Sequence, residues 1–260
     1  MIRSTSVAFF LLFTLQSMAE TSQVLKAVSP PNRVALFELF TSEGCSSCPP
    51  ADRFMSRLKE AGISDRQLIP LAFHVTYWDK LGWKDRFADK QHDDRQRRQV
   101  MLNASRTVYT PQYMLNGKDF RNYKSMYFDI DQINAQPALY RLELSAVQDS
   151  NSITVELDIT GVEGSDNTAV AYIALYEHNL NSLVTDGENE GEHLRHDYVV
   201  RELRGPFVIR KDQSEFKEAF TTADYKIADS GIVAFVQQSV SYTHLTLPTT
   251  CRVCRSRWSA

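Results

Sequence analysis

Apolar residues in the first half of the chain form short unbroken runs separated by helical stripes. Residues 34–40 are apolar on both faces except at Glu38, which is typical of an inner parallel strand. Four apolar residues between 51 and 58 then recur at the spacing i, i+3, i+4, i+7, which predicts an amphipathic helix over 50–61. A second apolar run at 68–75 predicts another strand, so this segment is expected to be a βαβ unit with a right-handed crossover.

The pattern becomes more polar after the second strand. Residues 85–103 are rich in charge and predict a helix, and residues 108–117 predict a proline-containing loop, a strand that tolerates an edge position and an Asn-Gly turn. We expect the basic cluster in this helix to be a solvated face rather than a binding patch; it consists of Arg95, Arg97 and Arg98.

Strict alternation of apolar and polar residues begins after residue 140. The segments 141–147 and 153–159 alternate and are separated by a polar turn, whereas 169–176 is apolar on both faces. Further candidate strands lie at 198–203, 207–209 and 232–236. Five or six strands at this spacing predict a small antiparallel β-sandwich. The expected fold is therefore α/β over 33–136 followed by a β-sandwich-like domain over 137–238.

The two ends of the chain differ from the body. Residues 1–19 have the features of a secretory signal peptide, with Arg3 before an apolar core and a small-x-small cleavage site before Glu20. This apolar run is shorter than the roughly 20 residues of a membrane span. We therefore expect a soluble periplasmic or secreted protein, with residues 21–32 as a polar leader into the first domain.

Residues 239–260 do not continue the strand pattern. Their sequence resembles translated adapter read-through, so we expect a non-native tail and do not count its Cys251 and Cys254 as a second redox motif. Loss of a native final strand here would leave an exposed sheet edge that favours aggregation.

Composition excludes some classes of partner. The formal net charge of −3 and a sequence pI near 6.1 give no general attraction to nucleic acid or anionic lipid. The 43% of hydrophobic residues is ample for packed cores, and four cysteines are too few for a disulfide-stapled scaffold of this length.

The strongest chemical motif is Cys45-Ser46-Ser47-Cys48, between the first strand and the start of its helix. Unpaired backbone N–H groups and the positive end of a helix dipole stabilise a thiolate on the first cysteine, which lowers its pKa. Two intervening residues keep the second sulfur close enough to attack a mixed disulfide. This placement indicates reversible thiol–disulfide exchange.

The order strand, Cys-x-x-Cys, helix, strand, helical insert, Thr-Pro and hairpin resembles a thioredoxin fold. The segments FTSEGCSSCPPAD, FHVTYWDKLGWKDRF, YTPQYMLNG and GENEGEHLRHDYVVREL resemble, more closely, an exported thioredoxin-like family catalogued as domain of unknown function 1223, over roughly residues 33–238. The resemblance implies an exposed attacking thiolate at Cys45, a more buried resolving thiol at Cys48, and a cis-Pro111 that exposes the Thr110 backbone to a substrate peptide.

The chain also departs from the thioredoxin pattern. Gly44 replaces the tryptophan that commonly precedes the first cysteine, and the buried acid position six residues before that cysteine is Leu39. Glu38 is one residue out of register for that proton-relay role. Glu43 would oppose thiolate formation slightly. The direction of exchange and the redox potential therefore stay open.

Two functional classes follow from these residues. The favoured hypothesis is an exported thiol–disulfide oxidoreductase without a cofactor, which acts on a protein or peptide disulfide and is served by an unknown redox partner. The alternative is a non-catalytic periplasmic binding module for a peptide, a partner or copper, in which the disulfide is structural. In the copper version His74 joins the two thiolates as a ligand.

Two further groups of residues are candidates for binding. An aromatic and acidic cluster after the second strand is expected either to line a peptide groove beside Cys45 or to cover the helical insert; it comprises Tyr77, Trp78 and Trp83 with Asp79 and Asp85, and His74 lies at its start. A Gly- and Glu-rich loop in the second half is interpreted as a divalent-ion site, as a mobile acidic loop, or as a docking segment that borders the Cys-x-x-Cys; its histidines are His178, His193 and His196.

Overall fold

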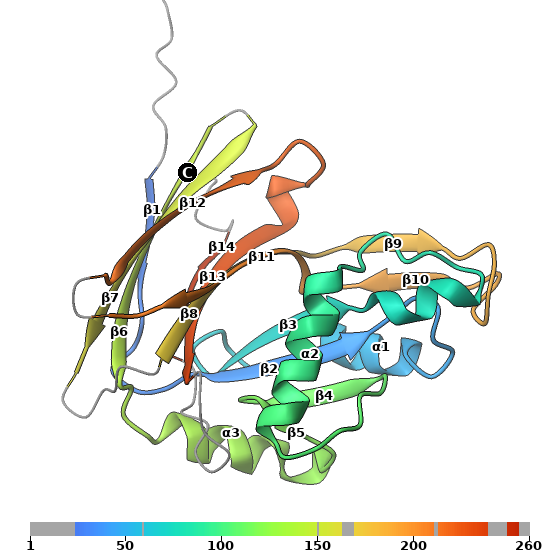
Figure 1. The fold of residues 1–260 in the computed structure, drawn as a ribbon, viewed down its shortest axis with the longest axis horizontal. Helices are drawn as coiled ribbons and strands as arrows, with labels where there is room; N and C mark the ends of the chain where they lie inside the picture. Colours follow the sequence, from blue (N-terminus) through green and yellow to red (C-terminus); the bar gives the residue numbers. More distant parts are fainter. Residues whose placement is uncertain are drawn as a thin grey trace, which may run out of the picture.

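A computed structural model gives the structure of the protein and describes residues 24–58, 60–149, 151–162, 169–210, 213–238 and 249–254. The architecture is mixed α/β and consists mostly of strands (Figure 1). The signal peptide expected at residues 1–19 lies outside the described residues and stays a prediction.

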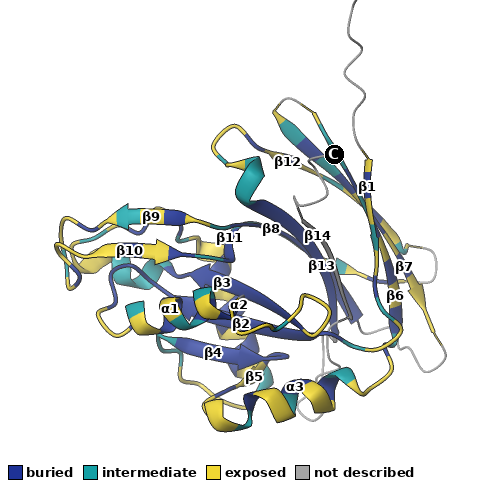
Figure 2. Cartoon of the chain, turned by 180° about the vertical axis from the view of Figure 1, so that it is seen from behind, coloured by how far each residue is buried: buried dark blue, intermediate teal, exposed yellow. Residues whose placement is uncertain are grey.

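The largest element is an eight-stranded sheet with the order β14-β13-β8-β11-β3-β2-β4-β5. β2 and β3 are parallel neighbours, as the two apolar runs predicted, and β4 pairs antiparallel with β2. Every residue of β2 and β3 is buried (Figure 2), which explains their unbroken apolar sequences. The strand bounds are β2 Ala35–Thr41, β3 Leu68–His74, β4 Gln112–Leu115, β5 Lys118–Asp119, β8 Ala169–Glu177, β11 Val199–Val208, β13 Ser230–Gln238 and β14 Thr249–Cys254.

Helices α1 and α3 share one hydrophobic cluster with one face of β2 and β4. α1 spans Pro49–Arg57, so it ends earlier than the predicted 50–61, and it buries the predicted stripe at Ala51, Met55 and Leu58. Its two prolines occupy the first turn, where a missing N–H costs little. α3, Met126–Asn134, was not predicted, and it adds Met126 and Ile130 to the same cluster.

Helix α2, Lys90–Leu102, covers the other face of β2 and β3 (Figure 1). It begins five residues later than predicted because the Asp89 side chain caps it by accepting a hydrogen bond from the Gln91 amide at 2.7 Å. The preceding residues form a 3₁₀ helix at Thr76–Leu81.

The prediction of a solvated basic face on α2 is wrong for Arg95. Its guanidinium is buried, donates to Glu38 Oε1 at 2.6 Å and to Gln237 Oε1 at 3.0 Å, and lies over the rings of Tyr172 and Phe235. A buried charge is tolerated only with such a partner. Glu38 is therefore part of an ion pair that holds α2 on the sheet.

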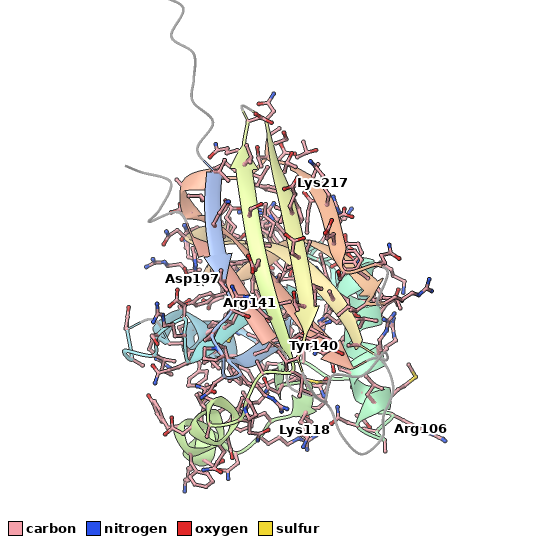
Figure 3. The ribbon with its side chains drawn as sticks, turned by 90° about the vertical axis from the view of Figure 1, so that its left-hand side faces the viewer. Arg106, Lys118, Tyr140, Arg141, Asp197 and Lys217 are labelled. Atoms are coloured by element: carbon pink, nitrogen blue, oxygen red, sulfur yellow. A yellow bond between two sulfur atoms is a disulfide. The ribbon has the colours of Figure 1, made fainter. Side chains whose placement is uncertain are left out.

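A four-stranded antiparallel sheet, β1-β6-β7-β12, forms the second layer. Alternate residues of β6 and β7 are buried, as predicted, and pack against β8 and β13 in one hydrophobic cluster. The outer face carries charged side chains such as Arg141 and Lys217 (Figure 3). The bounds are β1 Val24–Val28, β6 Tyr140–Gln148, β7 Ser152–Gly161 and β12 Glu215–Thr221.

Two of these strands differ from the expectation. Residues 24–28 were expected in a polar leader but form β1, which pairs with β6 along its whole length and buries only Leu25. β12 was not predicted, because its only buried positions are Phe216 and Phe220. Backbone pairing with a neighbouring strand, rather than a hydrophobic pattern of their own, gives both segments their structure.

The β-sandwich expected over 137–238 is not a separate unit. Its inner sheet is β8, β11 and β13, and these strands continue the sheet that holds β2 and β3. The junction is between β11 and β3, where Val199 is the parallel partner of Ala72 and the Ala72 amide donates to the Tyr198 carbonyl at 2.8 Å. The two halves therefore share one hydrogen-bonded sheet.

A β-hairpin precedes this junction. β9, Leu180–Leu183, pairs antiparallel with β10, His193–His196, and β10 lies beside α1 (Figure 1). The sequence pattern predicted only a loop over this stretch. The hairpin carries residues 184–192 toward the start of α1.

Within the expected non-native tail, residues 249–254 form β14 and pair antiparallel with β13. The edge that the missing strand was expected to expose is therefore covered by this segment. The remaining tail residues lie outside the described part of the chain.

No helix among the described residues is long and apolar enough to cross a membrane.

His92 on α2 provides a test of the packing between α2 and the sheet. Its ring is 1% exposed, its Nδ1 lies 2.9 Å from the His74 carbonyl oxygen, and burial lowers its pKa to about 4. Since the folded chain resists protonation, the unfolded chain binds this proton first, and stability is lost as pH falls from about 6.5 to about 4.

We expect His92→Asn to reduce the decrease in the free energy of unfolding over that pH window by roughly 3 kcal/mol, because one pKa unit corresponds to about 1.4 kcal/mol. The measurement is the free energy of unfolding by urea at several pH values. His193→Asn changes an exposed histidine and should leave the wild-type curve unchanged. Parallel curves for wild type and His92→Asn would contradict the prediction.

Candidate functional site

The Cys-x-x-Cys motif lies at the start of α1, as predicted, and its cysteines form a disulfide with a Cα–Cα distance of 5.4 Å. Cys48 is the residue that caps α1, and its amide donates to the Cys45 carbonyl at 3.0 Å. Both cysteines are 0% exposed, whereas Ser46 and Ser47 between them face solvent. The expectation of an exposed Cys45 is therefore wrong in this structure.

Thr110 contacts the first cysteine. Its hydroxyl donates to Cys45 Sγ at 3.3 Å and accepts a hydrogen bond from Trp78 Nε1 at 2.7 Å. The Thr110–Pro111 peptide bond is cis, as the resemblance implied. Trp78 thus holds the hydroxyl that contacts the sulfur, and the fold brings Cys48, Thr110 and Trp78 together with Cys45.

The segment between β9 and β10 packs against the Cys-x-x-Cys motif. Asn189 is buried, and its side-chain Nδ2 donates to the carbonyl oxygens of Glu43 at 2.7 Å and Cys45 at 3.0 Å. Glu188 Oε2 accepts hydrogen bonds from the Ser46 amide at 3.1 Å and the Ser46 hydroxyl at 2.7 Å. Of the interpretations offered for this loop, docking beside the Cys-x-x-Cys matches these contacts. We call residues 186–191 the cover loop.

Two glycines allow the cover loop to approach closely. Gly82 and Gly187 both have positive φ, at 112° and 77°, and a Cβ on Gly187 would lie 3.3 Å from the Leu81 carbonyl oxygen and the Trp83 amide nitrogen. Side chains at these positions would be strained by the backbone conformation and by the contact. The loop therefore packs backbone to backbone on residues 81–83.

A buried polar cluster lies at the ends of β3 and β10, starting with His74 and Asp85. His74 Nδ1 is 2.6 Å from Asp85 Oδ2, with both side chains 0% exposed. Burial alone would lower the pKa of His74 and raise that of Asp85. The mutual attraction and hydrogen bond, with further contributions from neighbouring groups, outweigh burial, so the pKa of His74 is raised and that of Asp85 is lowered.

The second pair is His196 and Glu43. His196 Nε2 lies 3.2 Å from Glu43 Oε1, and Trp83 Nε1 donates to Glu43 Oε2 at 2.8 Å. Burial would raise the pKa of Glu43, but the hydrogen bonds from His196 and Trp83 contribute to a net lowering. The rings of His74 and His196 meet edge to face with centroids 4.9 Å apart.

Asp52 completes the cluster from α1, one turn after Cys48. Its amide donates to the Cys48 carbonyl at 3.1 Å, and its Oδ2 accepts from the Thr41 hydroxyl at 3.2 Å. Burial raises the pKa of Asp52, and the positive charge available on the histidines offsets only part of this effect. Three carboxylates therefore share a buried space with two imidazoles.

The predicted histidines of the second half do not gather. His193 is exposed, and His178 contacts Asp197 at 3.3 Å and stacks edge to face on Tyr198. Only His196 of these three joins a group of metal-type donors within the described residues, and its partners are Asp52 and His74.

The aromatic residues predicted to line a groove or cover the helical insert contact different parts of the structure. Trp78 and Trp83 support Thr110 and Glu43, while the Tyr77 hydroxyl donates to Gln96 on α2 at 3.2 Å. A hollow of about 380 Å³ is lined in part by Pro111. Its lining residues are Tyr109, Pro111, Tyr113, Phe120, Arg121 and Tyr123.

Several residues of the site were missed from the sequence. Asp52 follows Cys48 by four residues on a predicted helix, and this spacing places it on the face nearest the cysteine. The contacts of Glu188 and Asn189 with the motif carried no local signal, because the partners lie more than 140 residues away.

The fold and site define a mixed α/β protein with a buried disulfide at a helix start, beneath a loop from its own second half. A family model described as protein of unknown function (DUF1223) matches residues 36–237, and the chain belongs to this family. No curated protein matches the chain.

Two solved structures resemble most of the chain. The X-ray structure of protein AGR_C_4864 from Agrobacterium tumefaciens is 21% identical, with a TM-score of 0.60 over 86% of this chain and 95% of that one. HBP35 of Porphyromonas gingivalis is 13% identical, with a TM-score of 0.64 over 86% of this chain and 76% of that one. At these identities the similarity shows the fold alone.

The cover loop allows a direct test of its contacts. We expect Asn189→Ala to accelerate reduction of the Cys45–Cys48 disulfide by dithiothreitol roughly thirtyfold, because two hydrogen bonds of about 1 kcal/mol each hold the loop closed. The rate is measured by quenching with an alkylating agent and mass spectrometry. Asn181→Ala, at an exposed position of the same hairpin, is the matched control. Equal rates for the two variants would show that the loop does not limit access.

Proposed function

We propose that this chain is an exported thiol–disulfide oxidoreductase with a thioredoxin-like core, acting on protein or peptide disulfides. The observation that carries the proposal is the Thr110 hydroxyl at 3.3 Å from Cys45 Sγ. A hydrogen-bond donor aimed at one sulfur stabilises negative charge there, which favours that sulfur as nucleophile and leaving group. A purely structural disulfide needs no such donor.

The placement of the motif supports the same reading. Cys45 and Cys48 lie between a buried parallel strand and the first turn of α1, where backbone N–H groups and the helix dipole favour a thiolate. β2, α1, β3, β4 and β5 follow the chain order of a thioredoxin core, and residue 111 precedes β4 in that order.

The exchange has two balanced steps. In the reduced protein the Cys45 thiolate attacks one sulfur of a substrate disulfide, forming a mixed disulfide and releasing the other substrate sulfur as a thiolate that takes up a proton. Cys48 then loses its proton and attacks Cys45 Sγ, which releases the second substrate thiolate and closes the Cys45–Cys48 disulfide. The substrate gains two electrons and the protein loses two. The reverse sequence oxidises a dithiol substrate.

Access to the sulfurs requires the cover loop to move. In the closed state Cys45 has no exposed surface, and Asn189 and Glu188 bind the motif from above. Glycines with positive φ near both ends of the loop, Gly187 and Gly191, make it a candidate gate, and opening it would break the bonds of Asn189 and Glu188 to the motif. Selectivity would then come from substrates or partners that displace it.

The hollow beside Pro111 is the proposed substrate-binding surface. Pro111 lines the hollow, and the preceding residue, Thr110, contacts Cys45. The tyrosines and Arg121 of the hollow offer stacking and hydrogen bonding to an extended peptide. An unknown redox partner would restore the dithiol after each turnover. Export rests on the signal peptide predicted at residues 1–19.

A binding module is the second candidate, favoured by the burial of both cysteines at 0% exposure. In that case the disulfide fixes the start of α1, and the hollow beside Pro111 takes a ligand without chemistry.

Trapping distinguishes the two candidates. We expect Cys48→Ala to accumulate mixed disulfides through Cys45 in periplasmic extract, because the resolving step is blocked. The adducts are captured by acid quenching and identified by mass spectrometry of the Cys45 peptide.

Cys45→Ala/Cys48→Ala is the matched control, because it retains Cys251 and Cys254 and reports any adduct on those thiols. If Cys48→Ala forms no more adducts than this control, the binding-module reading is favoured.

The Thr110 hydroxyl can be tested separately. In the Cys48→Ala background we expect Thr110→Val to slow alkylation of Cys45 by iodoacetamide roughly tenfold or more, because a hydrogen bond to a charged group contributes about 1.5 kcal/mol or more. Thr110→Ser keeps the hydroxyl and should retain most of the rate. Similar slowing in both variants would indicate a packing effect rather than a hydrogen bond to sulfur.

A further inference from the structure

Asp52, His74 and His196 converge behind the disulfide from three different elements, α1, β3 and β10. One ligand-type atom from each lies within 4.8 Å of the others, and the three residues are 4%, 0% and 2% exposed. His196 Nδ1 and Asp52 Oδ2 are 3.8 Å apart, which is too long for a hydrogen bond. The ligand-type atoms of the three side chains therefore lie close together without a hydrogen bond between them.

Each imidazole uses only one of its nitrogens. His74 Nδ1 contacts Asp85, and His196 Nε2 contacts Glu43. The other nitrogens, His74 Nε2 and His196 Nδ1, are buried and have no hydrogen-bond partner among the described residues. Buried polar atoms are rarely left in this state, so both nitrogens need a partner at the same place.

This arrangement is typical of histidines that bind a metal. A ligating histidine usually passes the N–H of its other nitrogen to a carboxylate, which fixes the tautomer and strengthens the metal bond. Here both histidines have that carboxylate. Trp83 in turn holds Glu43, and Thr41 holds Asp52.

Charge favours the same conclusion. The cluster contains the carboxylates of Asp52, Asp85 and Glu43, and their ion pairs in the described part of the chain are with the two histidines alone. A metal ion binds neutral imidazoles, and a divalent cation would then offset most of the negative charge of the three carboxylates.

We propose that Asp52, His74 and His196 bind one divalent transition-metal ion, with Asp85 and Glu43 as the supporting carboxylates. Two imidazoles and a carboxylate suit Zn²⁺ or Fe²⁺ and leave a fourth position open. Ligands held at about 2.0–2.1 Å from a tetrahedral ion lie about 3.4 Å apart, so the side chains close by roughly 1 Å on binding. The cysteine sulfurs are not ligands, and the site goes beyond the proposed redox function.

Metal binding is tested on the full chain with the Cys45–Cys48 disulfide closed and the remaining thiols alkylated, so that thiolates cannot bind the probe. The protein is refolded at pH 7.5 with Zn²⁺ or Co²⁺ and freed of excess metal. We expect one ion per chain, visible absorption bands of tetrahedral Co²⁺, and a higher melting temperature. Mg²⁺ should give none of these effects, because imidazole is a poor ligand for it.

Site variants assign the ligands. Asp52→Asn and His196→Gln should each weaken Co²⁺ binding at least thirtyfold, while His178→Gln and His193→Gln should not change it. Absence of stoichiometric binding, or equal binding by site and control variants, would overturn the proposal and leave a water-filled polar cluster. Where a site variant does not fold, X-ray absorption on the wild-type Zn²⁺ protein decides, and fewer than two imidazole ligands would equally overturn it.

This test is independent of the redox proposal. If the chain binds metal but Cys48→Ala traps no mixed disulfides, the metal site is supported and the redox function is not. If mixed disulfides form but no metal binds, the redox function is supported and the metal site is not.

Discussion

The pairing of β11 with β3 is the constraint on which the rest of the structure depends. It is short, with one register pair between Val199 and Ala72 and a hydrogen bond from the Ala72 amide to the Tyr198 carbonyl. Because the chain enters β11 directly from β10, this pairing fixes His196 beside His74 and carries the cover loop over Cys45. The hairpin in the second half of the chain thereby contributes residues to a motif more than a hundred residues earlier.

The buried polar cluster shows why these contacts must be accurate. A carboxylate removed from water is stabilised only when its partners replace the lost hydration. Glu43 has such a partner in His196, 153 residues away, whereas Asp52 and Asp85 bond to Thr41 and His74, each 11 residues away. Exposed pairs such as Lys217–Glu156 on the outer face of the sandwich remain solvated and contribute little to stability. The functional interest of the molecule therefore lies in its interior.

The burial of both cysteines means that the motif is not directly accessible to a substrate in this structure. The Thr110 hydroxyl contacts Cys45 Sγ, while Asn189 and Glu188 bond to the backbone and side chain of the same motif. If the cover loop opens for particular partners, as proposed, the loop would control when Cys45 becomes accessible. The same loop packs on the residues that carry Trp83, which holds Glu43, so opening would also disturb the cluster behind the disulfide.

The sequence by itself determined the local elements and the chemical motif. Unbroken apolar runs predicted β2 and β3, the stripe at 51–58 predicted α1, alternation predicted β6 and β7, and Cys45 and Cys48 lie at the predicted helix start. It did not determine β1 or β12, whose structure comes from pairing with neighbours, nor the burial of Arg95 on a helix that is polar in sequence. Only the tertiary structure decided that the sandwich shares the main sheet, that Asn189 covers Cys45, and that His196 joins Asp52 and His74. The physical reason is the separation of the residues along the chain. Local periodicity indicates which face of an element is buried, whereas hydrogen bonds between distant segments depend on how the sheet is assembled.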